Sequence, residues 1–213
     1  MKNVPQTFNV PDARFNHIHV DIVGPLPSSR GYNYLLTVVD RYSRWPEAYS
    51  IKDSTAETVA QALYAGWICR YGSQKIITTD QGVQFESHLF NALLKFIGAD
   101  RIRTTSYHPA SNGLVERWHR SLKAALMCHG SKFDWYDTLP TVLLGLRTSE
   151  RESIRASPAE YLFGTTLRVP DEFFSKENPE VDPQKFLVEH KKHMSDLKPV
   201  PVNRHGNVKT FIY

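Results

Sequence analysis

The chain has 213 residues, of which 41% are hydrophobic and 23% charged, and its formal net charge is +4. This length suits one large domain, and this composition excludes a chain that is disordered over most of its length. No segment has the roughly 20 consecutive apolar residues of a membrane span, and the first ten residues lack the apolar centre of a signal peptide. We therefore expect a soluble, unsecreted protein without a membrane partner.

The cysteine count excludes two further classes of protein. Only Cys69 and Cys128 occur, and neither has a second cysteine at metal-ligand spacing. The sequence therefore supports neither a disulfide framework nor a structural zinc site. We expect both cysteines to be buried, reduced thiols. The small positive charge is compatible with a polyanionic partner but does not identify one.

Short runs rich in β-branched residues predict three strands at the start of the chain. Residues 17–23 and 34–40 flank a turn-forming stretch and should pair in antiparallel fashion. Residues 44–51 should form a third strand at the sheet edge, where Pro46 can lack an N–H group.

Helices and strands alternate after the third strand. The expected elements are a helix over 54–70, a strand over 75–79, a helix over 86–97, a strand over 101–105, and helices over 114–129, over 135–147 and from 158. The segment STAE at 54–57 predicts a capping box, and Gly98 should end the second helix. The apolar positions expected to face the core of the first two helices are Val59, Leu63 and Trp67, and Leu89, Leu93 and Ile97.

The chain divides into two parts by composition. We expect a core domain over residues 8–170. Residues 171–183 carry five acids against one lysine, with two prolines, and the residues from 185 onward are basic. Residues 171–213 are therefore expected to be an acidic linker followed by a basic C-terminal extension.

Three carboxylates are candidates for chemistry, and each also has an ordinary structural interpretation. Asp21 alternates with His17 and His19 on a strand face that could simply be solvated. Asp80 ends a strand before Gln81-Gly82, as turn residues often do. Glu116 could form an ordinary surface ion pair with a residue one helical turn later.

The combination of these three carboxylates favours a metal site. If the strand at 75–79 lies parallel beside the strand at 17–23, Asp21 and Asp80 meet, and a helix can bring Glu116 over them. Carboxylates within about 4 Å repel by several kcal/mol, so they stay ionised together only around a cation. Oxygen ligands favour Mg²⁺ or Mn²⁺ over zinc. Two such ions can promote an in-line attack on a phosphodiester, which predicts phosphoryl transfer on nucleic acid.

Five segments carry a family resemblance: HVDIVGPLP, LLTVVDRYSRWPEA, TDQGVQF, YHPASNGLVERWHRSLK, and RTS with SPAEYLFG. Together they closely resemble the integrase core of gypsy-type long-terminal-repeat retrotransposons and, more distantly, retroviral integrases, over residues 8–174. The resemblance implies a ribonuclease H-like α/β fold with a five-stranded mixed sheet, in which three antiparallel strands come first and parallel strands follow, and with helices on both faces. It also implies that Asp21, Asp80 and Glu116 are catalytic and hold two Mg²⁺ or Mn²⁺ ions, with Asp21 between them.

The resemblance further implies an activity and its partners. The expected reactions are 3′-end processing of retroelement DNA and strand transfer into target DNA, in the nucleus, by a homodimer or higher oligomer. Arg120 and Lys123 also fall on the face of the helix that carries Glu116, by rotation of about 100° per residue. The positions that match the family's DNA contacts are Tyr107, His108, Asn112, Arg120 and Lys123.

The sequence also departs from the family pattern. It has no counterpart of the upstream zinc-binding His-His-Cys-Cys module, and Ala110 stands where glutamine is usual. The chain ends where the family continues into a further C-terminal domain, so we expect a fragment, with activity that could be reduced. Two alternatives stay open: a domesticated or decayed DNA-binding or interaction protein without catalysis, and a ribonuclease H-like nuclease acting on RNA–DNA hybrids.

Overall fold

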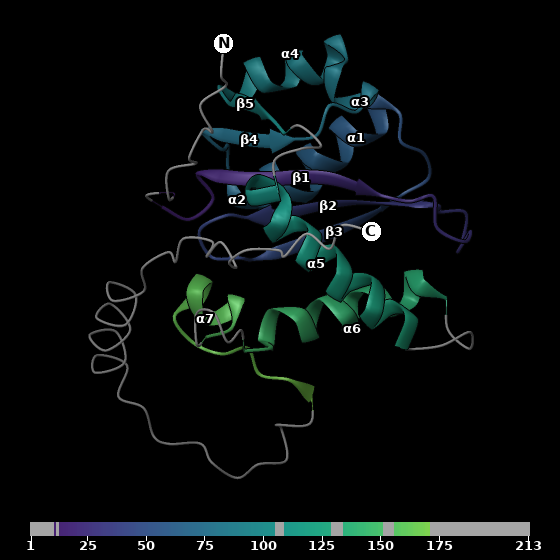
Figure 1. Cartoon of the computed structure of the whole chain (residues 1–213), viewed down its shortest axis with the longest axis vertical. Coiled ribbons are helices and arrows are strands. Elements are labelled where there is room, and N and C mark those ends of the chain that lie inside the picture. Colours follow the sequence, from purple (N-terminus) through teal and green to yellow (C-terminus); the bar gives the residue numbers. More distant parts are fainter. Residues whose placement is uncertain (1–10, 12, 105–108, 129–133, 151–155, 171–213) are drawn as a thin grey trace, which may run out of the picture.

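A five-stranded sheet in the order β3-β2-β1-β4-β5 forms the centre of the molecule (Figure 1). The structure is a computed structural model that describes residues 11, 13–104, 109–128, 134–150 and 156–170, with the backbone alone for 109–114. The expected extension at 171–213 therefore lies outside the described residues.

The strand directions confirm the predicted mixed sheet. Strand β1 (His17–Val23) pairs antiparallel with β2 (Tyr34–Asp40), and β2 pairs antiparallel with β3 (Pro46–Ile51). On its other side β1 runs parallel to β4 (Ile76–Thr79), which runs parallel to β5 (Asp100–Arg103). Strand β3 lies at the edge of the sheet and begins at its proline, two residues later than predicted.

Helices pack on both faces of this sheet. Within the described part of the chain, none of them is long and apolar enough to cross a membrane. They are α1 (Ala56–Leu63), which continues through the π-helical turn η1 (Tyr64–Ile68) into α2 (Cys69–Tyr71), then α3 (Val83–Glu86), α4 (His88–Ile97), α5 (Pro109–Cys128), α6 (Trp135–Thr148) and α7 (Pro158–Phe163).

The first helix begins one residue later than the predicted capping box. Thr55, not Ser54, is the N-cap, and its side chain accepts a hydrogen bond from the N–H of Thr58. The carboxylate of Asp53 accepts hydrogen bonds from both the N–H and the hydroxyl of Thr55, which fixes Thr55 in the capping position. The predicted capping box is therefore wrong, although the buried positions Val59, Leu63 and Trp67 are confirmed.

The predicted helix over 86–97 is α4, which begins at His88, two residues later than predicted, and α3 is a separate short helix before it that was not predicted. Ser87 ends α3 and caps α4, and Gly98 ends α4 in the left-handed conformation as predicted. The fully buried residues of α4 are Phe90 and Leu94. Of the predicted core positions, Leu93 and Ile97 are partly buried and pack against the same core, whereas Leu89 is 47% exposed, so the prediction is wrong at Leu89 alone. The ring of Phe90 packs against that of Phe85 in α3, so Phe90 is buried in the core next to the exposed Leu89.

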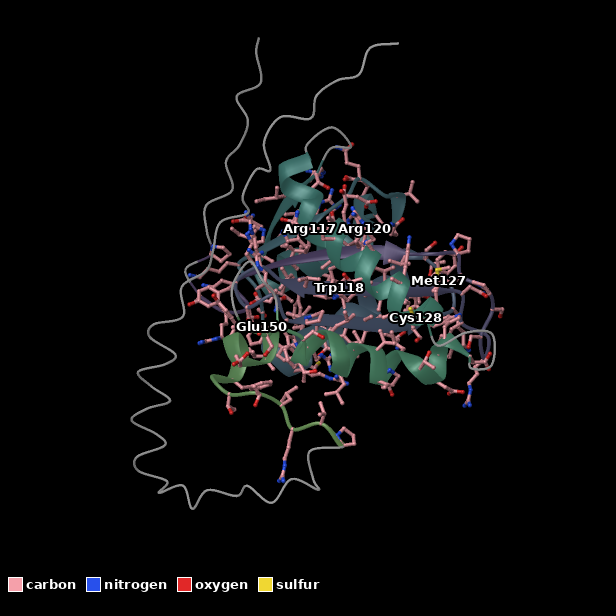
Figure 2. The ribbon with its side chains drawn as sticks, turned by 60° about the horizontal axis from the view of Figure 1, so that its bottom comes forward. Arg117, Trp118, Arg120, Met127, Cys128 and Glu150 are labelled. Atoms are coloured by element: carbon pink, nitrogen blue, oxygen red, sulfur yellow. The ribbon has the colours of Figure 1, made fainter. Side chains whose placement is uncertain are left out.

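Two further expectations are corrected. Helix α5 begins at Pro109, five residues earlier than predicted, since proline is well tolerated in a first helical turn. Cys69 and Cys128 are free but exposed, not buried. Cys69 begins α2 beyond the π-helical turn, and Cys128 ends α5, where Figure 2 shows it beside Met127.

Each face of the sheet has its own hydrophobic core. On one face, alternate residues of β1 and β2 pack with Trp67 of η1 and Phe90 of α4. On the other face, Leu35 and Val39 of β2 pack with Trp118 of α5 and with Leu139 and neighbouring residues of α6. In Figure 1, α5 passes in front of β1 and β2 and runs down to α6. The helix that carries Glu116 is thus fixed on one face of the sheet.

A buried ion pair joins α6 to the edge strand β3. The guanidinium of Arg147 lies 2.7 Å from the carboxylate of Glu47, and the two side chains are 18% and 7% exposed. Arg147 also donates to the carbonyl of Pro46 and lies over the ring of Trp45. Tyr71 donates its hydroxyl hydrogen to Glu47 Oε1, the carboxylate oxygen that does not face Arg147 in the ion pair. These contacts replace the hydration that both charges lose on folding.

We expect Arg147→Met to lower the free energy of unfolding by about 3 kcal/mol, because it leaves the Glu47 carboxylate buried without its counter-charge. The control is Arg30→Met, which breaks an ion pair with Asp137 whose side chains are about half exposed and should cost less than about 1 kcal/mol. Urea unfolding measures both. An equal decrease in the free energy of unfolding for the two variants would contradict the conclusion that burial makes the Arg147–Glu47 ion pair important for stability.

Candidate functional site

Asp21 lies on the face of β1 that α5 covers. The residues Ile18 and Val20 point into the core on the opposite face, and the period-2 alternation of a strand therefore groups Asp21 with His17 and His19. The interpretation of this face as solvated is wrong, since His17 and His19 are 4% and 5% exposed. A carboxylate that emerges from such a covered face is only partly hydrated.

Asp80 lies beside Asp21 because β1 and β4 are parallel neighbours. His19 pairs with Thr78; Asp21 is two residues further along β1, and Asp80 directly follows the end of β4. The charge of Asp80 acts on the Asp21 carboxyl, as expected for close neighbours. The carboxylate of Asp80 accepts a hydrogen bond from the N–H of Gly82 at 2.9 Å, which shapes the turn after β4. The predicted parallel pairing of these two strands is therefore confirmed.

Hydrogen bonds from β5 hold the segment that follows Asp80 in place. Arg101 of β5 donates to the carbonyl of Phe85 and to the carboxylate of Glu86, both in α3, and its side chain is only 5% exposed. Arg103 donates to Glu86 as well, at 2.8 Å. These bonds hold α3 against β5 and so fix the segment that follows Asp80.

The charge of Asp21 is unfavourable in this position. Burial raises the pKa of its carboxyl to about 6, and the neighbouring charge of Asp80 acts in the same direction. The N–H of Ile22, which donates to Asp21 Oδ1 at 2.7 Å, and the cation of Lys123 act in the opposite direction. Two carboxylates that repel each other at the edge of a sheet are a donor set that suits a divalent cation.

Helix α5 supplies the rest of the site. Trp118 and Leu122 are buried against the sheet, one helical turn apart. With these two residues packed on the sheet, another face of α5 carries Glu116, His119 and Lys123. Glu116 and Lys123 are exposed. Figure 2 shows Arg117 and Arg120 on the same stretch of α5. The helix therefore brings acidic, basic and imidazole groups to the edge where Asp21 lies.

His119 is the residue of this site that the sequence did not assign. Its Nε2 lies 2.8 Å from the Thr37 hydroxyl of β2, and its Nδ1 lies 3.7 Å from Asp21 Oδ2. Burial and, secondarily, the charge of Lys123 lower the pKa of the imidazole to about 4, so the ring is neutral at pH 7. The signal available in the sequence was its spacing, three residues after Glu116 and four before Lys123.

The structure brings some of the predicted site residues together and not others. Asp21 and Asp80 are neighbours, and Glu116 is on the helix that covers Asp21. In the described residues, no group of three or more His, Cys, Asp or Glu side chains is close enough to hold one metal ion. Of the predicted DNA contacts, Arg120 and Lys123 are exposed on α5, Asn112 is described in its backbone alone, and Tyr107 and His108 lie outside the described residues.

A match to a family model agrees with this geometry. The model of the integrase core domain matches residues 11–109. The chain carries an integrase core domain. It is 31% identical over 166 residues to the retrovirus-related Pol polyprotein from transposon 412 of Drosophila melanogaster, a match that covers 76% of this chain and 13% of that protein. It is 36% identical over 152 residues to the Gag-Pol polyprotein of Feline leukemia virus, covering 70% of this chain and 9% of that protein.

Solved integrase cores share the fold. The catalytic core domain of BIV integrase superposes with a TM-score of 0.57 at 26% identity, covering 68% of this chain and 92% of that chain. The catalytic core domain of HTLV-2 integrase, solved in complex with magnesium, superposes with a TM-score of 0.56 at 18% identity, covering 68% of this chain and 95% of that chain. The integrase core thus has the ribonuclease H-like fold that the sequence predicted.

We expect Asp21→Asn to stabilise the metal-free protein at pH 7.5. Because the pKa of Asp21 is higher in the folded than in the unfolded protein, the protonated carboxyl adds to the free energy of unfolding. This stabilisation is fully present below about pH 4 and is lost as the pH rises through about 6. The asparagine variant should gain roughly 1 kcal/mol at pH 7.5, less than a fully buried carboxyl would give because the side chain is 35% exposed.

The gain should disappear at pH 3.5, where the aspartic acid is itself neutral. Urea unfolding in the presence of a chelator at both pH values measures the difference. Glu116→Gln is the matched control, and its effect should be near zero at both pH values because Glu116 is exposed. If Asp21→Asn raised the free energy of unfolding equally at both pH values, the charge of Asp21 would not be the cause, and this explanation would be contradicted.

Proposed function

We propose that this integrase core is a divalent-metal-dependent polynucleotidyl transferase that processes the 3′ ends of retroelement DNA and joins them to target DNA. The observation that carries the proposal is that Asp21 of β1 lies near Asp80, which directly follows the parallel strand β4, with the Asp21 carboxyl partly buried and repelled by the charge of Asp80. In the metal-free protein, the repulsion between the two carboxylates destabilises their charged forms, and a bound cation removes this repulsion. The magnesium complex of the HTLV-2 core supports the choice of ion.

Each residue has a role in this proposal. Asp21 and Asp80 would hold the ions from the sheet, and Glu116 would hold them from α5. Two bound Mg²⁺ or Mn²⁺ ions would activate the attacking oxygen and neutralise the charge that develops on the phosphate. A water is the nucleophile in end processing. In strand transfer, the new 3′ hydroxyl attacks a target phosphodiester, and one phosphorus–oxygen bond forms as another breaks.

The proposed partner is DNA, bound by a homodimer or higher oligomer in the nucleus. The HTLV-2 core was solved in dimeric and trimeric forms, and the simian T-cell lymphotropic virus intasome is a related assembly. Arg120 and Lys123 would contact phosphates from α5, together with Tyr107, His108 and Asn112. We place the catalytic core at residues 8–170 and an extension at 171–213. The chain spans only about 9 to 14% of the curated relatives considered.

We expect Asp21→Asn, Asp80→Asn and Glu116→Gln each to reduce strand transfer at least about a hundredfold, because each removes a charge that holds the ions. The measurement is the joining of a labelled duplex with a recessed 3′ end to plasmid DNA in Mn²⁺. The control is Glu57→Gln, an exposed carboxylate at the start of α1, which should retain full activity. Joining by the Glu116→Gln protein at the wild-type rate would remove Glu116 from the mechanism.

One observation favours the non-catalytic alternative, since the described residues do not gather three metal-binding side chains. Titration of the wild-type protein with Mg²⁺ and Mn²⁺ by calorimetry separates the two functions. Saturable binding that Asp21→Asn abolishes supports the transferase, whereas DNA binding without any cation binding supports a protein that has lost its chemistry. A substrate panel that includes an RNA–DNA hybrid tests the nuclease alternative.

We expect Arg120→Ala and Lys123→Ala to weaken DNA binding uniformly across sequences, because both cations would contact phosphates rather than bases. Each variant should also lower the slope of the logarithm of affinity against the logarithm of salt concentration by about 0.9. Fluorescence anisotropy with two unrelated duplexes measures both effects. Lys95→Ala, an exposed lysine of α4, is the control and should change neither quantity. A loss confined to one duplex would instead indicate base recognition.

A further inference from the structure

The contacts of Thr37 determine which nitrogen of His119 carries the proton. The Thr37 Oγ1 lies 3.0 Å from the backbone carbonyl oxygen of Asp21, and a carbonyl oxygen can only accept. The single proton of the hydroxyl is therefore used in that bond. Since Oγ1 also lies 2.8 Å from His119 Nε2, the nitrogen must be the donor in the second bond.

The other ring nitrogen is then an acceptor that faces a carboxylate. A neutral imidazole has one N–H group, so Nδ1 of His119 carries a lone pair. It lies 3.7 Å from Asp21 Oδ2, which is too long for a hydrogen bond. Two electron-rich atoms that face each other at this distance repel, unless a cation lies between them.

The separation and the chemistry of these atoms suit one divalent ion. Metal ions lie about 2.1 Å from nitrogen and oxygen ligands, so two donors 3.7 Å apart can contact the same ion. Oδ1 of Asp21 accepts the Ile22 N–H, and that bond turns Oδ2 toward His119. Both donors therefore have fixed positions, one through Ile22 and the other through Thr37.

We propose that His119 Nδ1 is a metal ligand beside Asp21, so that the cation site of this chain has a mixed nitrogen and oxygen donor set. This inference rests on the proposed function and deepens it, because it departs from the oxygen-only site that the sequence predicted. Carboxylates suit both Mn²⁺ and Mg²⁺, but Mn²⁺, as a transition ion, accepts an imidazole nitrogen more readily than the harder Mg²⁺ does. The site should therefore prefer Mn²⁺ to Mg²⁺ by more than an all-carboxylate site would.

The test is spectroscopic and does not depend on activity. Electron spin echo envelope modulation of Mn²⁺ bound to the wild-type protein should show the coupling of a directly bound ¹⁴N nucleus. His119→Gln should lose this coupling and bind Mn²⁺ at least about tenfold more weakly by calorimetry, with a smaller change for Mg²⁺. His88→Gln replaces an exposed histidine of α4 and should keep both the coupling and the affinity.

Two variants of Thr37 test the origin of the tautomer. Thr37→Val removes the hydroxyl that accepts from His119 Nε2 and should weaken both Mn²⁺ binding and the ¹⁴N coupling. Thr37→Ser keeps the hydroxyl and should retain both. Because Thr37 is buried, thermal unfolding of the two variants is compared, and a similar melting temperature rules out a general loss of structure as the cause.

The outcomes separate this inference from the proposed function. Mn²⁺ binding without ¹⁴N coupling, or coupling that persists in His119→Gln, overturns the role of His119 and leaves strand transfer by the carboxylates intact. Wild-type protein that binds no Mn²⁺ overturns both the ligand assignment and metal-dependent catalysis. Asp21→Asn, which should abolish Mn²⁺ binding in either case, verifies that the ion observed is at this site.

Discussion

The burial of Trp118 and Leu122 against the sheet is the interaction on which the candidate site depends. These two residues fix the rotation and the height of α5 over β1 and β2, and they share a core with Leu35 and Val39 of β2. Any rotation of α5 about its axis would move His119 and Lys123 away from Asp21. The energy that holds the charged groups together is thus supplied by apolar packing on the same helix.

The sheet contributes the second constraint, which is electrostatic. Parallel pairing of β1 with β4 places two carboxylates at one edge, and the covered face deprives Asp21 of part of its hydration. The fold therefore keeps a charge where that charge is unfavourable for stability. Such a cost is typical of functional positions, because a binding site for a cation must be anionic before the cation arrives.

The polar groups around the site differ in how firmly they are held. Thr37, His119 and the backbone of Asp21 form a chain of hydrogen bonds on the covered face, whereas Glu116 and Lys123 are exposed on α5. Arg101 and Glu86 fix the segment after Asp80 from the other side. The site thus combines a rigid part on the sheet with a more exposed part on the helix, where a long polyanion can approach.

The sequence by itself determined the positions of the strands to within about two residues and the buried faces of α1 and α5. The strands β1 and β2 and the start of α7 at Pro158 depend on neighbouring residues, so local patterns predicted them at or near the observed positions. The same patterns placed Glu116, Arg120 and Lys123 on one face. Tertiary structure alone decided the burial of His17 and His19, the burial of Phe90 in place of Leu89 and the contact of His119 with Thr37. These features depend on which surface packs over another and at what distance, and side-chain periodicity along one element does not contain that information.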